Sequence, residues 1–226
     1  MHKRKVTRKI SYNRSFFIFL SNMNSESSIL RLSEMLVERS ILKFGTFKLK
    51  SGLTSWFYVD LRLIPSYPSL FQYIISCYKE LLKEIPDDID GLAGVAVAGI
   101  PFSSVLGYEL SLPALIVRPQ PKEHGLKKQV EGIAEKGSNI VIIDDLITTG
   151  GSKIPSITAL EEEGYTVRHL VVLIDRSEGE LKELKEKGIK IHSYATINQI
   201  FEACLKLSDN ILSIEQKDLI RKNWKN

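Results

Sequence analysis

The chain shows two spacings of apolar residues, one typical of helices and one typical of strands. Between residues 28 and 39 apolar residues recur every three or four positions, which predicts an amphipathic helix. Residues 44–62, FGTFKLKSGLTSWFYVDLR, are rich in aromatic and β-branched residues and are broken at Gly52, so they predict two short strands around a turn. Residues 66–85 return to the helical spacing and stop before Pro86.

From residue 91 to residue 197 the chain alternates between short apolar runs and helical stretches. The apolar runs predict strands at residues 91–99, 113–119, 139–145, 167–176 and 189–197. The stretches between them predict helices at residues 100–110, 152–163 and 179–187. Strands that are covered on both faces are apolar throughout, and helical connections make such a sheet parallel. The sequence therefore predicts an α/β fold, a Rossmann-like parallel sheet flanked by helices.

These elements divide into a small N-terminal subdomain and a larger core within a single domain, residues 23–226. We place the subdomain at residues 28–65, the core at residues 66–200 and C-terminal helices at residues 200–226. No internal repeat, low-complexity segment or linker separates them. The length of 226 residues, with 43% hydrophobic and 26% charged residues, allows one domain with a sizeable core.

The net charge of +4 comes from the amino-terminal end of the chain. Six of the 31 basic residues stand in residues 1–22, which hold no acidic residue, so the remainder carries 25 basic against 27 acidic residues. The body thus lacks the basic excess of a nucleic-acid-binding protein. The apolar run at residues 16–20 is too short to span a membrane and is poor as a signal peptide. We expect residues 1–22 to be a disordered basic head, included by assignment of an upstream start, with Met23 as the working start; a targeting peptide is the other interpretation.

The two cysteines add no predicted disulfide bond and no predicted metal site. Cys77 and Cys204 are far apart and in no CxxC spacing, which gives neither a disulfide framework nor a thiolate metal site. Two buried apolar residues are the simplest interpretation. This cysteine usage is typical of a protein from the reducing cytoplasm.

The stretch NIVIIDDLITTGGSK, residues 139–153, ends a predicted strand in two carboxylates and continues into hydroxyl and glycine residues. Asp144 and Asp145 fall at the carboxyl edge of the sheet, where open α/β sheets bind ligands. Residues 148–152 form the turn into the next helix, whose unpaired amides and helix dipole suit a phosphate. Carboxylates just before that turn suit vicinal hydroxyls. The predicted ligand is a ribose that bears a 5′-phosphate.

Three other interpretations of this stretch are weaker. GGSK lacks the GxxxxGK[ST] spacing of a Walker loop, and no GxGxxG turn occurs in the chain. A structural strand end with an aspartate cap and a glycine turn would explain an isolated DD pair. It does not explain why the apolar run before the pair and TTGGS after it occur together.

The stretch IVIIDDLITTGGS resembles the phosphoribosyl-pyrophosphate (PRPP) signature of the type I phosphoribosyltransferases. Three other segments are similar to the orotate phosphoribosyltransferases in particular. FKLKSGLTSWFYVDLR resembles their amino-terminal substrate segment, RPQPKEHG their mobile catalytic loop, and VLIDRSEG their base-recognition strand end. The resemblance keeps the same order from residue 30 to residue 200. It implies the type I phosphoribosyltransferase fold, with the N-terminal subdomain as a hood.

This resemblance implies transfer of a phosphoribosyl group from PRPP to N1 of orotate, which gives orotidine 5′-monophosphate and pyrophosphate in de novo UMP synthesis. It implies Mg²⁺ as cofactor, held mainly by substrate and water and by no residue directly. It also implies a cytoplasmic homodimer in which the 120–131 loop of one subunit closes over the active site of the other, with no nucleic-acid or membrane partner. Two alternatives stay open: a phosphoribosyltransferase for another nucleobase, and a PRPP-sensing regulator without catalysis.

The resemblance also assigns roles to individual residues. The expected catalytic residues are Lys122, His124 and Asp145. The expected PRPP-binding residues are Arg118, Lys122, His124, Asp144, Asp145, Leu146, Ile147, Thr148, Thr149, Gly150, Gly151 and Ser152. The expected orotate-binding residues are Lys50, Phe57, Tyr58, Thr148 and Arg176.

Several of these residues have a structural explanation as well. Lys50 and the loop cations suit a solvated surface, and Phe57 suits core packing about as well as the face of a pyrimidine. Arg176 suits a bidentate contact with the orotate carboxylate. An ion pair with Asp175 or Glu178 is the weaker explanation of the same residue.

One position departs from the family pattern. The turn after the first core strand often holds a lysine in this family, and here it holds Ala98 before Gly99. The backbone amides of this turn remain to bind pyrophosphate. One cation is missing.

Overall fold

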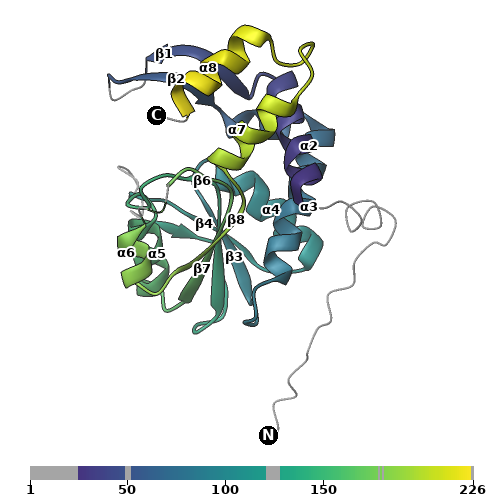
Figure 1. Cartoon of the computed structure of the whole chain (residues 1–226). Helices are drawn as coiled ribbons and strands as arrows, with labels where there is room; N and C mark the ends of the chain where they lie inside the picture. Colours follow the sequence, from purple (N-terminus) through teal and green to yellow (C-terminus); the bar gives the residue numbers. More distant parts are fainter. Residues whose placement is uncertain (1–24, 49–51, 121–127, 178, 180, 225–226) are drawn as a thin grey trace, which may run out of the picture.

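A six-stranded sheet forms the centre of the structure, and a smaller hood lies over the carboxyl ends of its strands (Figure 1). The structure is a computed structural model, and it describes residues 25–48, 52–120, 128–177, 179 and 181–224. The strands lie in the order β5-β4-β3-β6-β7-β8. They are β3 (Gly91–Val95), β4 (Ala114–Val117), β5 (Val130–Glu131), β6 (Asn139–Ile147), β7 (Thr166–Asp175) and β8 (Lys190–Thr196).

The predicted α/β fold is confirmed, with one correction at the edge of the sheet. Strands β3, β4, β6, β7 and β8 pair in parallel. The two-residue strand β5 pairs antiparallel with β4, so the sheet is mixed and the prediction of a wholly parallel sheet is wrong there. Val130 and Glu131 lay within the predicted loop, because a strand of two residues leaves no periodic pattern in the sequence.

Helices cover the sheet on both faces, which explains the nearly continuous apolar runs of its strands (Figure 1). Along β6, Ile143 belongs to the core under α3 (Pro68–Lys83) and α4 (Gly99–Leu110). Its neighbour Ile142 belongs to the second core, under α5 (Ile154–Glu162) and α6 (Lys182–Glu186). Successive residues of a strand point to opposite faces, so each core receives alternate side chains.

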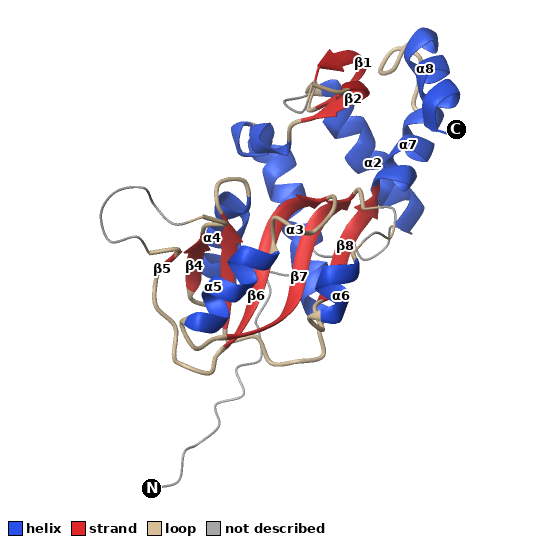
Figure 2. Cartoon of the chain, turned by 90° about the vertical axis from the view of Figure 1, so that its left-hand side faces the viewer, coloured by secondary structure: helices blue, strands red, loops and turns tan. Residues whose placement is uncertain are grey.

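The hood combines segments from both ends of the described chain (Figures 1 and 2). Its hairpin of β1 (Leu42–Lys48) and β2 (Thr54–Val59) confirms the two strands predicted around Gly52. Helix α2 (Ser25–Glu38) confirms the first predicted helix and packs against α7 (Ile197–Lys206), while α8 (Ile214–Trp224) packs against β1. The short helix η1 (Leu61–Ser66) leads from the hood to α3. The hood is therefore larger than residues 28–65, because the C-terminal helices belong to it.

An aromatic cluster joins the two ends of the chain in the hood. Phe201 of α7 lies 4.7 Å from the ring of Trp56 and 5.0 Å from that of Phe57 between centroids. Phe44 and Trp224 lie 6.2 Å from the same ring. Buried aromatic pairs of this kind add to the stabilisation that comes from buried area alone. Through Phe201, the hairpin and α8 thus pack against the same helix, α7.

All five predicted core strands end at a residue other than the expected one, and the causes of two of these differences are clear. The apolar run at residues 91–99 is a strand only to Val95, because residues 96–98 form a turn and α4 begins at Gly99. The strand predicted at residues 139–145 continues to Ile147, because β7 pairs with it up to Asp175. None of the helices in the described ranges is long and apolar enough to cross a membrane.

Gly99 allows α4 to lie directly on β6. A Cβ atom at this position would overlap the carbonyl oxygen of Ile143 and lie 3.2 Å from Cα of Asp144. We expect Gly99→Ala to lower the free energy of unfolding by about 1–3 kcal/mol, although alanine favours helix formation. Urea denaturation of the purified variant measures this.

Gly151→Ala is the matched control for this prediction. The nearest atoms to a Cβ there are side-chain oxygens 3.9 and 4.0 Å away, so we expect little change in unfolding free energy. Equal stability of the two variants would show that α4 moves freely away from β6, which contradicts the close packing described here.

Candidate active site

The carboxyl ends of β6 and β7 lie side by side beneath the hood. Ile147 faces Asp175 in the strand register, and the backbone N–H of Arg176 donates to the carbonyl of Ile147 at 2.8 Å. Parallel pairing therefore places Arg176 next to the turn that follows Asp144 and Asp145. The structure thus brings together two segments that are about 30 positions apart in the sequence.

Asp144 is almost fully buried, and both of its carboxylate oxygens have partners. Oδ1 accepts the backbone N–H of Asp145 at 2.9 Å, and Oδ2 forms an ion pair with Nζ of Lys153. The side chains of Asp144 and Lys153 are 4% and 11% exposed, so this is a buried ion pair. The hydroxyl of Tyr78, from α3, donates to the backbone carbonyl of Asp144 at 2.7 Å.

Asp145 is the more accessible carboxylate of the pair. Its Oδ1 accepts the backbone N–H of Leu146 at 2.7 Å, and the residue is half-buried. Burial, followed by the negative charge of Asp144, raises the pKa of Asp145 to about 7. Lys153 opposes this rise without cancelling it. Near neutral pH the carboxyl is therefore ready to ionise when hydrogen-bond donors approach it.

The turn after β6 exposes the groups that suit a phosphate. Thr148, Thr149, Gly151 and Ser152 are exposed. Gly150 is buried against Leu181 and Leu184, has φ +77°, and accepts the N–H of Lys153 at 2.8 Å. This anchored glycine holds the turn at the start of α5, where helix amides and dipole favour an anion.

Arg176 and Phe57 form the hood side of the site. The guanidinium lies 4.7 Å from the centroid of the Phe57 ring, and burial lowers the pKa of Arg176. Among the described residues no carboxylate pairs with Arg176, and Asp175 instead accepts the N–H of Ser177 at 2.7 Å. The guanidinium is thus available to a ligand, because the predicted alternative partner Asp175 is engaged elsewhere; Glu178 lies outside the described residues.

Phe57 and Tyr58 are not brought to the same side of the hairpin. They are consecutive in β2 but have different neighbours. Phe57 meets Arg176 and Phe201, whereas Tyr58 lies 5.8 Å from the ring of Phe47 between centroids and accepts from Arg62 at 3.5 Å. The pair therefore does not enclose one pyrimidine ring from the same face of β2.

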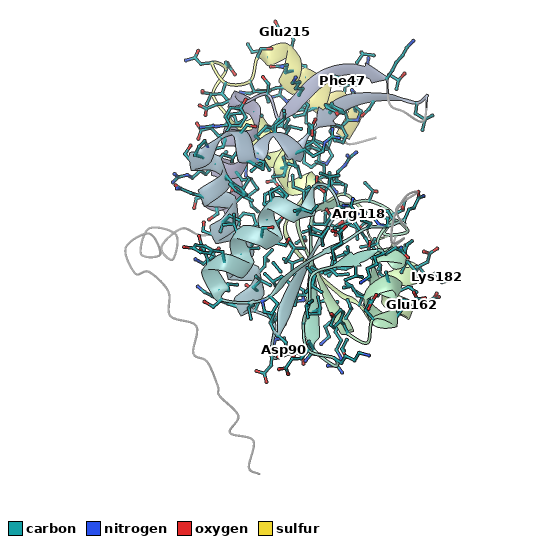
Figure 3. The ribbon with its side chains drawn as sticks, turned by 180° about the vertical axis from the view of Figure 1, so that it is seen from behind. Phe47, Asp90, Arg118, Glu162, Lys182 and Glu215 are labelled. Atoms are coloured by element: carbon teal, nitrogen blue, oxygen red, sulfur yellow. The ribbon has the colours of Figure 1, made fainter. Side chains whose placement is uncertain are left out.

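Arg118 and the turn before α4 complete the described part of the site. Figure 3 shows Arg118 at the end of the core that faces the hood, opposite Asp90. Nη2 of Arg118 lies 3.4 Å from Oε1 of Glu131, and its buried Nε has no hydrogen-bond partner among the described residues. In the turn, Ala98 is half-buried and Gly99 is buried at the first position of α4.

Known proteins resemble this chain in both sequence and fold. Residues 65–206 match the family described as "Phosphoribosyl transferase domain". The orotate phosphoribosyltransferase of Pyrobaculum islandicum is 41% identical over 161 residues, which cover 71% of this chain and 82% of the relative. That of Sulfolobus acidocaldarius is 31% identical over 185 residues, 82% of this chain and 91% of the relative. The crystal structure of orotate phosphoribosyltransferase from Aeropyrum pernix superposes with a TM-score of 0.71 at 35% identity, over 78% of this chain and 99% of that one.

The chain belongs to the orotate phosphoribosyltransferase family. The resemblance drawn from its sequence segments is thereby confirmed. Three expected residues of this phosphoribosyltransferase, Lys50, Lys122 and His124, lie outside the described residues, and their roles stay predictions.

Two residues near the pair of Asp144 and Asp145 were not among those expected from the sequence. Lys153 directly follows the GGS turn, but only the folded structure shows that it reaches back to Asp144. Arg62 forms an ion pair with Asp60 at 2.7 Å, which raises the pKa of the guanidinium; the charge of Asp145 adds a smaller contribution. A basic residue at the end of the substrate segment was the available signal for Arg62.

The described residues contain no group of three or more histidine, cysteine, aspartate or glutamate side chains placed to hold a metal ion. One carboxylate of the site, Asp144, is already bonded to Lys153. The expectation that Mg²⁺ is held mainly by substrate and water is not tested by these residues. The ligand set of the metal stays a prediction.

The raised pKa of Asp145 makes the stability of this phosphoribosyltransferase depend on pH. The carboxyl loses its proton near pH 4 in the unfolded chain and near pH 7 in the folded chain, so its ionisation lowers the unfolding free energy as pH rises through this range. We expect Asp145→Asn to increase the unfolding free energy at pH 8 by roughly 2–4 kcal/mol, at about 1.4 kcal/mol per pKa unit.

The increase should fall to about 1 kcal/mol or less at pH 4.5, where the wild-type carboxyl is protonated in the folded state and only the unfolded chain still gains from ionisation. Urea denaturation of both proteins at the two pH values provides the comparison. A stability difference that is the same at both pH values would mean that Asp145 does not carry the raised pKa.

Proposed function

We propose that this protein is an orotate phosphoribosyltransferase, which converts orotate and PRPP to orotidine 5′-monophosphate and pyrophosphate in pyrimidine biosynthesis. One observation carries the proposal. The guanidinium of Arg176 has no carboxylate partner among the described residues. Its backbone is bonded to the end of β6, next to the carboxylate pair and the turn at residues 148–152, and these two features suit ribose 5-phosphate. The named relatives, all orotate phosphoribosyltransferases, support it.

The reaction builds positive charge on the ribose ring and negative charge on the leaving pyrophosphate. In the proposed mechanism, the exposed turn at residues 148–152 holds the 5′-phosphate, and Asp145 accepts hydrogen bonds from the ribose hydroxyls. These donors favour the ionised form of Asp145, whose negative charge then stabilises the positive ring. Catalysis rests on positioning and electrostatics.

Orotate is held where the core meets the hood. Arg176 binds the carboxylate in a bidentate contact, which uracil cannot offer. Phe57 lies against the guanidinium and fixes its position from behind. We assign Lys50 to the same substrate, and Lys122 and His124 to the leaving pyrophosphate, with His124 as the general acid.

The remaining features extend beyond the described residues. Bound Mg²⁺ would supply positive charge to the pyrophosphate. We propose a cytoplasmic homodimer in which the loop at residues 120–131 acts on the partner's site. Both cysteines are free and buried, which supports a reducing compartment. The mixed charge of the body supports neither a nucleic-acid nor a membrane partner.

Loss of orotate absorbance in the presence of PRPP and Mg²⁺ tests the proposed reaction, and Arg176→Ala tests its base choice. We expect the variant to lose about 3 kcal/mol of transition-state binding, which is roughly a hundredfold in kcat/KM for orotate. Binding of PRPP, measured by calorimetry, should stay within about twofold, because Arg176 contacts only the base in this mechanism.

Arg168→Ala is the matched control for Arg176→Ala, because Arg168 is exposed near the other end of β7. It should keep wild-type kinetics. Near-normal kcat/KM for orotate in Arg176→Ala would remove Arg176 from the base site. An inactive wild-type protein that still binds PRPP would favour a PRPP-sensing regulator.

Mixing two inactive variants tests the loop across the dimer. Asp145→Asn inactivates the sugar site, and the double variant Lys122→Ala/His124→Ala inactivates the loop. If the loop acts on the partner, each mixed dimer has one intact loop over one intact site, and random exchange makes about half of the dimers mixed. Activity should therefore recover to about a quarter of wild type.

Each parent must first be inactive alone, and native mass spectrometry must confirm subunit exchange. A mixture that exchanges subunits and stays inactive would show that the loop acts within its own subunit.

A further inference from the structure

The buried ion pair between Asp144 and Lys153 spans the whole phosphate turn. Asp144 lies within β6, whereas Lys153 is the residue before α5, and the turn at residues 148–152 lies between them. The contact joins the two ends of this segment in the interior. Nζ of Lys153 and the carboxylate of Asp144 are both buried, while most of the turn residues are exposed.

The same contact separates the roles of the two carboxylates. Each oxygen of Asp144 already has a protein donor, and the side chain is 4% exposed. Asp145 is half-buried, and only a backbone N–H of the described residues donates to its carboxylate. Asp145 is therefore the more accessible carboxylate of the two.

We propose that Lys153 is a positioning residue, whose ion pair with Asp144 fixes the phosphate turn to β6 and leaves Asp145 as the carboxylate that binds the ribose hydroxyls. This inference rests on the proposed function for the identity of the substrate. It corrects the expectation that Asp144 and Asp145 share the sugar hydroxyls. Lys153 acts through Asp144 and the turn, and it does not itself touch the substrate.

The charged and titratable groups around Asp145 support this division of roles. They come from four elements: Asp144 from β6, Lys153 from the start of α5, Arg62 from η1 and Tyr78 from α3. Lys153 lowers the pKa of Asp145, so it favours the ionised carboxyl that accepts hydrogen bonds from a diol. Removal of Lys153 leaves two carboxylates in one buried place without their cation, a costly arrangement.

A double-mutant cycle tests the proposal with Lys153→Met, Asp144→Asn and the combined variant. Ribose 5-phosphate is the probe, because its binding needs the turn and the diol site and requires no orotate turnover. We expect each single variant to weaken ribose 5-phosphate binding at least about tenfold in calorimetry. The combined variant has neither charge, and its introduced side-chain amide still offers an oxygen to the N–H of Asp145. Its affinity should therefore return to within about threefold of wild type.

Two further readouts separate positioning from a general structural role. In Lys153→Met the KM for PRPP should rise at least about tenfold while kcat changes less than about threefold. The pH at which ribose 5-phosphate binding is half-maximal should also rise by about one unit, because a nearby cation has been removed from Asp145. Binding of inorganic pyrophosphate, which does not use this turn, should stay within about twofold and shows that the variant is folded.

The outcomes are distinct. Additive losses in the two single variants would show that the ion pair does not act as a unit, and would overturn the proposal. A combined variant that binds ribose 5-phosphate as poorly as Asp145→Asn would show that Asp144 itself contacts the sugar, which also overturns it. A wild-type protein without orotate turnover would remove the proposed function, while the ribose 5-phosphate cycle would still decide the role of Lys153.

Discussion

The parallel pairing of β6 with β7 is the constraint on which the rest of the structure depends. It extends from Asn139 to Ile147 and continues in the bond from the N–H of Arg176 to the carbonyl of Ile147. Because this register is held by backbone bonds and by side chains buried on both faces, a slip along β7 would move both cores together. The backbone bonds and buried side chains of β6 and β7 thus fix the position of Arg176 relative to the turn at residues 148–152.

The hood adds the second half of the site, and it is attached by aromatic packing. Phe57 joins Arg176 on one side and Phe201 on the other. A guanidinium from the core and a ring from the hood therefore meet at the point where the base is proposed to bind. A change in the orientation of the hood would therefore alter the proposed base site. It would leave the turn at residues 148–152 in place, because that turn belongs to the core alone.

Much of the fold could be predicted from the sequence, and so could the place of the carboxylate pair and of the turn after it, because both depend on local patterns. Strands buried on both faces gave apolar runs, and DDLITTGGS combined carboxylates with a turn into a helix. The resemblance to a substrate segment grouped Phe57 with Tyr58, whereas in the structure the two side chains have different neighbours. The features that escaped prediction depend on distant contacts. Nothing near Lys153 in the sequence shows that its ammonium turns inward to Asp144, because a solvated lysine looks the same.

A hood built from both ends of the chain also sets an order of folding. Lys206 of α7 bonds to Glu26 of α2 across a separation of 180 residues, and the hairpin finds its aromatic partners in α7. During synthesis, β3 to β7 can pair before α7 is made, since all of their strand partners precede α7 in the chain. The hairpin and α2, although made first, lack the surface of α7 to pack on until that helix has left the ribosome. We expect the apolar side of the first-made segment to stay exposed for longest, and this is where a chaperone would find its binding site on the nascent chain.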